Sequence, residues 1–392
     1  MNRSNPLPSG RCVGGIFLVA GTTIGAGMLA LPLMAGMIGI GYSIIFLLGM
    51  WWLMYQSALV TIELNHFFPE PQSLPVIAKK IWGNIGGIAV SVVFYALFYS
   101  LLVAYITGAT SIIRSAIPFD HPHLGAICSI IVTVILGGMI VLRIEWLDLA
   151  NRFFFFIKII AFGGLIIALA PFLTEVPQFF PDPLPSHWAQ VIPIFFTAFG
   201  FHGSIPSIIK YVSRNHQRST FFWGSFIPFI FYGIWIAITL APFQKKIMDI
   251  SQSTGGDLGL FIKNLARLID FPLFETLASV FALMAIFTSF LGVGIALYHL
   301  IQEHLPSKSK LNHIGLTFLL PLLFVLINPD SFLAALSYAG LALGLLAIIF
   351  PALLNLTMRG QQSIEFLLKR QSVTILLMIG LILIGIELVR VH

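Results

Sequence analysis

Two short segments of the chain place glycines, polar residues and a proline inside long apolar runs. The first is GTTIGAGMLALP (residues 21–32), and the second is TAFGFHGSIPSI (residues 197–208). Glycine and proline weaken a helix, and in lipid each backbone group freed by a break needs another partner. The N-terminus of a half-helix favours a carboxylate, and freed carbonyl groups favour an ammonium group or a cation. Together the two segments predict a binding site for a zwitterion such as an amino acid.

We predict that the backbones of both segments bind this ligand. The imidazole of His202 can hydrogen-bond a ligand hydroxyl or titrate, and we favour the first role. A polar contact between helices is the alternative role for this histidine. The predicted binding residues are Gly21, Thr22, Thr23, Ile24, Gly25, Ala26 and Gly27 in the first segment and Phe199, Gly200, Phe201, His202 and Gly203 in the second.

An aromatic ligand needs an apolar pocket with ring partners. Tyr95 and Tyr99 lie four residues apart, so they share a helix face, and Tyr338 lies in a later apolar run. Tyr99 is the pocket residue that we predict among the three. Because aromatic residues make up 13% of the chain, packing is the alternative role for each of them.

One lysine lies deep inside an apolar run. In FFFFIKIIAFGG, Lys158 follows Asn151 by seven residues, which is roughly 10 Å at 1.5 Å per helical residue. An ionisable side chain at membrane depth predicts a function, and a stem that snorkels to the interface is the alternative. Most acidic residues are expected to be interface charges at span ends. Glu63 is the exception, and we would test it as a second proton carrier besides Lys158.

These residues belong to a chain with the composition of a membrane protein. Of its 392 residues, 58% are hydrophobic and 9% are charged, against about 25% charged in a soluble domain, and the mean hydropathy is +0.97. The fold class is therefore an all-α polytopic membrane protein, with a single transmembrane domain over residues 1–392. The predicted spans are residues 12–35, 38–62, 84–114, 124–142, 149–171, 188–211, 218–242, 271–301, 311–327, 330–356 and 370–391.

The positive charges predict an orientation. Most of the 21 lysine and arginine residues fall on one side, which predicts a cytoplasmic N-terminus and, with eleven spans, a periplasmic C-terminus. Four of the six exceptions lie in the loop 243–270. There Leu258, Ile262, Leu265 and Leu268 share one face and predict a short amphipathic helix. This helix either covers an outer mouth of the protein or lies at the interface without such a role.

The two glycine-rich segments occupy matching positions in the chain. Each begins a set of five spans, residues 12–171 and residues 188–356, and the sets start on opposite sides of the membrane. This arrangement predicts an inverted repeat with a ligand site at the midplane, and residues 370–391 form an additional helix. The sequence holds no nucleophile–base arrangement, metal-ligand spacing or phosphate-binding loop, so no enzyme activity, cofactor or metal is expected. A channel is less favoured because the chain carries its own symmetric site.

Four motifs resemble those of the hydroxy and aromatic amino acid permeases of the amino acid/polyamine/organocation superfamily. They are GTTIGAGMLALP, AYITGA (104–109), FGFHGSIPSI (199–208) and FTSFLG (287–292), and the resemblance covers nearly the whole chain. The tyrosine-specific branch is the most similar. The resemblance implies a LeuT-type five-plus-five fold in a bacterial inner membrane and proton symport of tyrosine into the cytoplasm. Tryptophan or a broad range of neutral amino acids, and sodium coupling or exchange, stay open as alternatives.

The expected partners are an amino acid, a proton and the lipid bilayer, with no nucleic acid and no obligate protein partner. The resemblance also implies a role for Lys158. In sodium-coupled transporters of this fold, a hydroxyl pair and first-span carbonyls surround a sodium ion. Thr288 and Ser289 supply such a pair here, and an ammonium group donates three hydrogen bonds. We therefore predict that Lys158, with Thr288 and Ser289, replaces sodium and couples transport to protons; packing between helices is the alternative for the hydroxyl pair.

Overall fold

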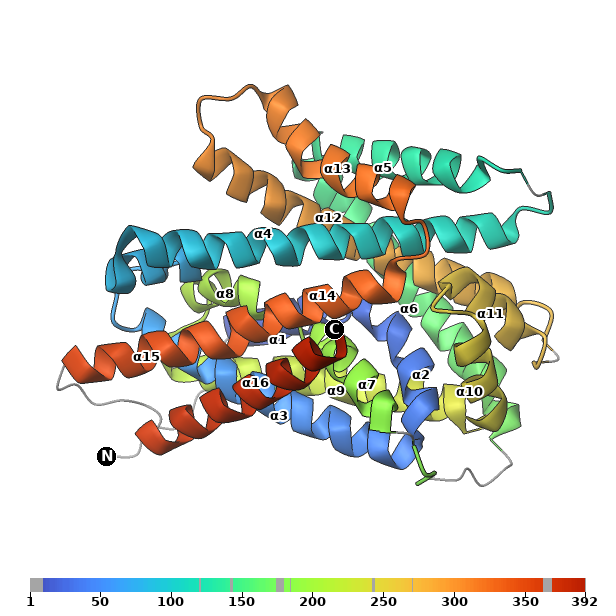
Figure 1. Ribbon diagram of the computed structural model, residues 1–392, viewed down its shortest axis with the longest axis horizontal. Coiled ribbons are helices and arrows are strands. Elements are labelled where there is room, and N and C mark those ends of the chain that lie inside the picture. The colour runs from blue at the N-terminus through green and yellow to red at the C-terminus, as the bar shows by residue number, and fades with distance from the viewer. Residues whose placement is uncertain are drawn as a thin grey trace.

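The chain folds as a bundle of helices, several of which run side by side along the long axis of the molecule (Figure 1). The computed structural model describes residues 10–119, 121–141, 144–173, 180–183, 185–241, 244–269, 271–361 and 369–391. Its α-helices are α1 (Gly10–Thr23), α2 (Gly27–Ile38), α3 (Ile40–Asn65), α4 (Leu74–Ala116), α5 (Leu124–Val141), α6 (Ile144–Leu169), α7 (Pro185–Ala198), α8 (Ile205–Tyr211), α9 (Gln217–Leu240), α10 (Gln244–Ser253), α11 (Leu258–Ala266), α12 (Phe274–His304), α13 (Lys310–Ile327), α14 (Phe332–Gly344), α15 (Phe350–Gln361) and α16 (Arg370–Val391).

The described residues form eight helical stretches that are long and apolar enough to cross a membrane, and nine if the bent pair α1–α2 is one span. Two shorter apolar helices, Leu124–Ile140 and Arg370–Ile386, lie where two further spans are predicted. The all-helical, multi-pass architecture is thus confirmed, and the count of eleven spans stays a prediction. The predicted third span begins at residue 84, whereas α4 begins at Leu74. The helix is kinked at Gly83, whose φ of 75° lies outside the helical region.

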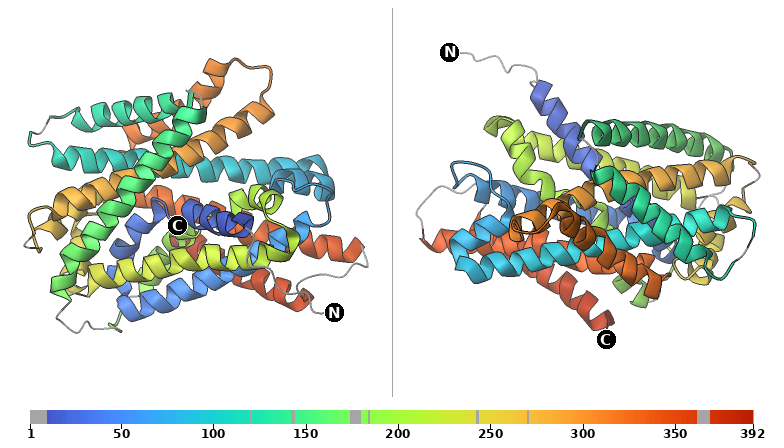
Figure 2. Two further views of the ribbon diagram at one scale, coloured as in Figure 1. Left: turned by 180° about the vertical axis from the view of Figure 1, so that it is seen from behind. Right: turned by 90° about the horizontal axis from the view of Figure 1, so that it is seen from above.

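The two halves of the broken first span share one neighbour and differ in the others. Both α1 and α2 pack on α9, and α2 also packs on α7 and α10. Other large contacts join α6 to α12, α4 to α14 and α12, α7 to α14, and α3 to α9. Figure 2 shows α6, in green, crossing the long helices obliquely in its left view. Both broken segments therefore end among packed helices, where their free backbone groups need partners within the protein.

The tenth predicted span is one continuous stretch, Phe332–Arg359, with a wide turn in its middle. Residues Leu345–Ile349 form a π-helical turn between α14 and α15. The hydroxyl of Ser57 on α3 donates a hydrogen bond to the carbonyl of Ala347 within this turn. A π turn inserts an extra residue and loosens the regular ladder, so a hydroxyl from a neighbouring helix can reach its carbonyl groups.

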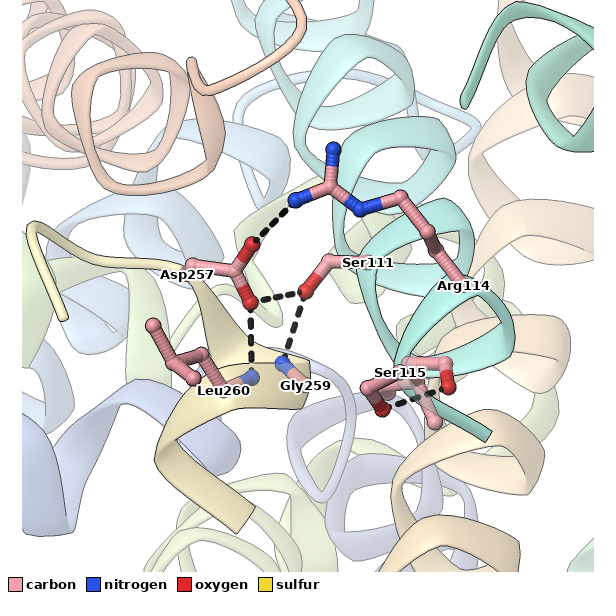
Figure 3. Close-up of polar contacts among 7 residues, drawn as sticks. Ser111, Arg114, Ser115, Asp257, Gly259 and Leu260 are labelled. Carbon is pink, nitrogen blue, oxygen red and sulfur yellow. Dashed lines mark hydrogen bonds and ion pairs between the residues drawn. The ribbon is translucent and has the colours of Figure 1, made fainter. Parts of the chain in front are cut away.

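The loop 243–270 holds two helices, α10 and α11, where one was predicted. The amphipathic helix is confirmed as α11, with Leu258, Ile262 and Leu265 buried, whereas Leu268 lies beyond its end in a turn. In Figure 3, Asp257 lies between the start of α11 and the end of α4. One carboxylate oxygen accepts from the Leu260 N–H at 2.7 Å and from the Ser111 hydroxyl at 2.6 Å, and the other lies 3.5 Å from Arg114.

This contact between α11 and α4 is very close. The Ser111 hydroxyl also accepts a hydrogen bond from the Gly259 N–H at 2.7 Å. A Cβ atom at Gly259 would overlap the carbonyl group of Ser111. Glycine is therefore required there by the approach of one backbone to another, and α11 is held at the end of α4 by hydrogen bonds that leave no room for a side chain.

Candidate functional site

The first broken segment separates α1, which ends at Thr23, from α2, which begins at Gly27 and is bent away by 59°. The break lies where the sequence pattern predicts it, and it turns glycine-rich backbone toward neighbouring helices. Its carbonyl groups all have partners. The Gly25 and Ala26 carbonyls accept from the N–H groups of Met28 and Leu29 in tight turns. The other two, from Thr23 and Ile24, accept from side chains on other helices.

Lys158 is one of these side chains. Its ammonium nitrogen donates a hydrogen bond to the Ile24 carbonyl at 3.0 Å and lies 5.0 Å from the centre of the Phe155 ring. The side chain is 1% exposed. It therefore does not snorkel to the surface, and the structure brings the amine of α6 to the first break. An ammonium group buried there uses one of its three donors on a backbone carbonyl.

Ser289 on α12 meets the same break from another direction. Its hydroxyl oxygen accepts a hydrogen bond from the Ala26 N–H at 3.0 Å, and the hydroxyl of Tyr105 on α4 lies nearby. A Cβ atom on Gly25 would lie 2.5 Å from this oxygen. The glycine thus permits the approach of α12. Thr288, the second predicted hydroxyl, donates instead to the carbonyls of its own helix at Met284 and Ala285.

The second broken segment lies between α7, which ends at Ala198, and a short 3₁₀ turn, His202–Ser204, that leads into α8. The two breaks touch. A Cβ atom on Gly27 would lie 3.2 Å from the Cα atom of Ala198 and from the carbonyl oxygen of Thr197. Here too glycine is required by a close approach of two backbones, so the structure brings both predicted segments together.

Tyr232 on α9 joins the two breaks, and the sequence patterns did not single it out. Its hydroxyl oxygen lies 2.6 Å from the Thr23 carbonyl oxygen and 2.7 Å from that of Ala198. These carbonyls end α1 and α7. The Tyr232 ring packs edge-on against Phe199, with the ring centres 5.5 Å apart, and the side chain is fully buried.

Several backbone donors at the breaks have no acceptor among the described residues. They are the N–H groups of Gly25, Gly27, Gly200 and Gly203. Gly200 and Gly203 are exposed, as are Gly21 and Thr22 at the end of α1, and a Cβ atom at Gly21 or Gly203 would meet open space. Unpaired N–H groups next to open space are suited to a carboxylate.

His202 is buried, and neither of its ring nitrogens makes a hydrogen bond within the described chain. Its ring stacks on Phe201 with centres 4.7 Å apart, near the backbone of Met54 on α3. The imidazole therefore faces α3, and it does not join Lys158 or Ser289. A buried polar ring without partners is unusual, so its predicted ligand role stays a prediction.

The predicted aromatic residues are not brought to the breaks. The Tyr99 hydroxyl donates to the Leu316 carbonyl of α13 at 2.9 Å, Tyr95 stacks on Tyr99, and Tyr338 is 51% exposed. The α4 tyrosine that lies near the first break is Tyr105, which is next to Ser289. It belongs to the motif AYITGA, which carries part of the family resemblance, so that motif contained the missed signal.

Glu63 has a cation beside it. Its carboxylate lies 2.8 Å from the Arg359 guanidinium of α15 and accepts from the Asn355 amide at 3.2 Å. The acid and the arginine are 2% and 8% exposed. Such a buried, hydrogen-bonded pair joins α3 to α15, away from the contacts of Lys158, and is typical of a structural ion pair. The proton-carrier role of Glu63 stays a prediction.

Comparison with known proteins places this geometry in a family. The sequence profile of the tryptophan/tyrosine permease family matches residues 9–390. The tyrosine-specific transport system 1 of Haemophilus influenzae is 33% identical over 352 residues, which cover 87% of this chain and 86% of that protein. The tryptophan-specific transport protein of the same bacterium is 32% identical over 368 residues, or 87% and 86% of the two chains.

A third relative is named for a different substrate. The glutamine transporter 2 of Aliivibrio fischeri is 28% identical over 361 residues, covering 90% of each chain. All three names describe transporters, and the sequence resemblance to permeases is confirmed over nearly the whole chain. The protein is a multi-pass membrane transporter and not an enzyme, and the chain belongs to the tryptophan/tyrosine permease family.

Proposed function

We propose that this protein is a symporter that carries an aromatic amino acid, tyrosine first, into the cytoplasm together with a proton. The observation that carries the proposal is the hydrogen bond from Lys158 to the Ile24 carbonyl at 3.0 Å, inside the broken first span. A lysine can hold one proton and release it, and here its protonation state acts directly on the backbone of a break. Names of relatives that specify tyrosine and tryptophan support the substrate class.

The two breaks supply the groups that a zwitterion needs. Glycine N–H groups at positions 25, 27, 200 and 203 are donors for its carboxylate, and the Gly200 carbonyl is an acceptor for its ammonium group. We assign the ligand backbone to residues 21–27 and 199–203 on this basis. Tyr105, buried beside Ser289, is a stronger candidate than Tyr99 for contact with the ligand side of the first break.

The finer architecture is part of the same proposal. We assign a LeuT-type fold of two inverted five-helix repeats, residues 12–171 and 188–356, with residues 370–391 as an eleventh helix. Matching breaks that touch at Gly27 and Ala198 support a site between the repeats. The protein would lie in a bacterial inner membrane with its N-terminus in the cytoplasm, where most lysines and arginines then lie. Alternating exposure of this site would move the substrate.

The test is uptake of labelled tyrosine into sodium-free proteoliposomes with an imposed inward proton gradient. The wild type should accumulate tyrosine. Lys158→Ala should lose accumulation yet keep tyrosine exchange between the two sides, because exchange needs binding but no net proton movement. Lys79→Ala, which removes an exposed amine, is the matched control and should behave as the wild type.

Three results would change the proposal. Accumulation that requires sodium, or that survives Lys158→Ala, removes the lysine from the coupling step. Exchange without accumulation in the wild type identifies an exchanger. Stronger competition by tryptophan or glutamine than by tyrosine moves the substrate; the glutamine transporter among the relatives is the reason to include glutamine.

A further inference from the structure

Two helix ends meet at one hydroxyl group. α1 ends at Thr23 and α7 ends at Ala198, so the last carbonyl of each helix has no N–H partner in its own helix. Both oxygens instead lie within hydrogen-bonding distance of the Tyr232 hydroxyl, at 2.6 and 2.7 Å. The tyrosine comes from a third helix, α9, that packs on α1 and on α2.

The phenol and the two carbonyl groups contribute unequally to this contact. A phenol has a single hydrogen to donate, and a carbonyl oxygen has none. The two carbonyls therefore share one hydrogen. Both lie at the negative ends of helix dipoles, so without that hydrogen they would repel each other. Because Tyr232 is fully buried, no water is available to replace it.

We propose that Tyr232 is a positioning residue that holds the two breaks in one common geometry through its shared hydroxyl. This inference rests on the proposed function in one respect, that the two breaks together bind the transported amino acid. Two further contacts act in the same direction. Gly27 packs on the backbone of Ala198, and the Phe199 ring holds the Tyr232 ring edge-on. Loss of the hydroxyl would let each break shift without the other.

The experiment compares Tyr232→Phe with Tyr298→Phe, both in the full chain in lipid nanodiscs. Tyr298 is the matched control because its hydroxyl accepts from Gln302 on its own helix, away from the breaks. The first measurement is amide hydrogen exchange over residues 20–28 and 196–204. Removing one hydrogen bond predicts a rise of about two- to twelvefold in both segments for Tyr232→Phe, and no rise for Tyr298→Phe.

The second measurement is tyrosine uptake, which separates a positioning role from a merely structural one. Tyr232→Phe should raise the KM by a similar factor with the maximal rate per folded transporter kept. A variant that only folds less well would lower the maximal rate per total protein and leave the KM unchanged. If the wild type carries no aromatic amino acid, the proposed function fails, and the exchange measurement still decides the role of Tyr232.

Unchanged exchange in both segments, or a rise in only one of them, would overturn the proposal. If Tyr232→Phe does not fold, Phe199→Leu takes its place. That change removes the ring edge that orients Tyr232 but keeps its hydroxyl, so exchange should rise in both segments by a smaller factor. No rise with Phe199→Leu would equally overturn the proposal.

Discussion

Replacing Gly25 with alanine should disable the first break through a single contact. Gly25 does not have a positive φ, so alanine can adopt its backbone conformation. The obstacle is Ser289, whose hydroxyl oxygen would lie 2.5 Å from the new Cβ atom, whereas ordinary contacts begin near 3.4 Å. The serine must move by about 0.9 Å or rotate, and either change breaks its hydrogen bond with the buried Ala26 N–H.

The size of the effect follows from that hydrogen bond. Leaving a buried donor without a partner costs about 1–3 kcal/mol. This corresponds to a change of roughly 5- to 150-fold in the equilibrium between the native arrangement of the break and a distorted one. Ser289→Ala should cost about the same, because it orphans the same N–H group. The Ser289 Cβ atom lies 3.7 Å from the position of the new methyl group. The double variant therefore has room for both alanines and should be no worse than Ser289→Ala alone.

The assay is the initial rate of tyrosine uptake into proteoliposomes at equal reconstituted amounts, with thermal unfolding as a readout that does not depend on the substrate. Gly163→Ala is the control, since nothing lies near an added Cβ atom there, and alanine suits a helix better than glycine. Full activity of Gly25→Ala with Ser289 intact would refute the reasoning. So would a double variant whose loss equals the sum of the two single losses in free energy.

Three further predictions concern other parts of the fold. Gly259→Ala should push α11 off the Ser111 carbonyl and speed amide exchange over residues 257–266, and an unchanged rate would contradict the close contact. Arg359→Met leaves the Glu63 carboxylate without its guanidinium and should cost roughly 3–5 kcal/mol of stability, seen as poor expression that Glu63→Gln in the same chain restores. Burial lowers the pKa of His66 below 6.5, against the smaller opposite effect of its hydrogen bond to Gln217. The folded state thus favours the neutral ring, so stability is full above pH 6.5 and falls as the pH drops towards the lower folded pKa. Thermal unfolding of His66→Gln should show a weaker dependence on pH in that window.

The breaks and the buried amine were predictable because their residue types are unusual in an apolar, membrane-spanning helix. Glycines and a proline are out of place in an apolar helix, and so is the charge of Lys158, so composition along the chain is enough to find them. The pairing of Lys158 with the first break, rather than with lipid headgroups, came from family resemblance. Periodicity alone gives the depth of a residue but not the helix that faces it.

Tyr232 and Tyr99 show why the rest was out of reach. Four-residue spacing places Tyr95 and Tyr99 on one face of α4, but only packing decides that this face meets α13. Tyr232 lies in FIPFIFYGIWIAI, a run dense in aromatic residues, where one more ring attracts no notice. The available signal was its hydroxyl, since no other residue of that run carries one. Its meaning depends on two carbonyls from other helices, α1 and α7, and only packing brings these to α9.

The carbonyls of the first break also bear on how the protein returns after it has delivered its cargo. Every carbonyl from Thr23 to Ala26 is hydrogen-bonded by the protein itself, so this segment leaves no acceptor uncompensated when no ligand is present. An obligatory exchanger needs an empty state that is too unfavourable to reorient. In the proposed cycle, carbonyl groups that already have partners within the protein lower the cost of an unloaded first break, while the N–H groups of Gly25 and Gly27 remain for a ligand, and this arrangement fits net accumulation better than one-for-one exchange.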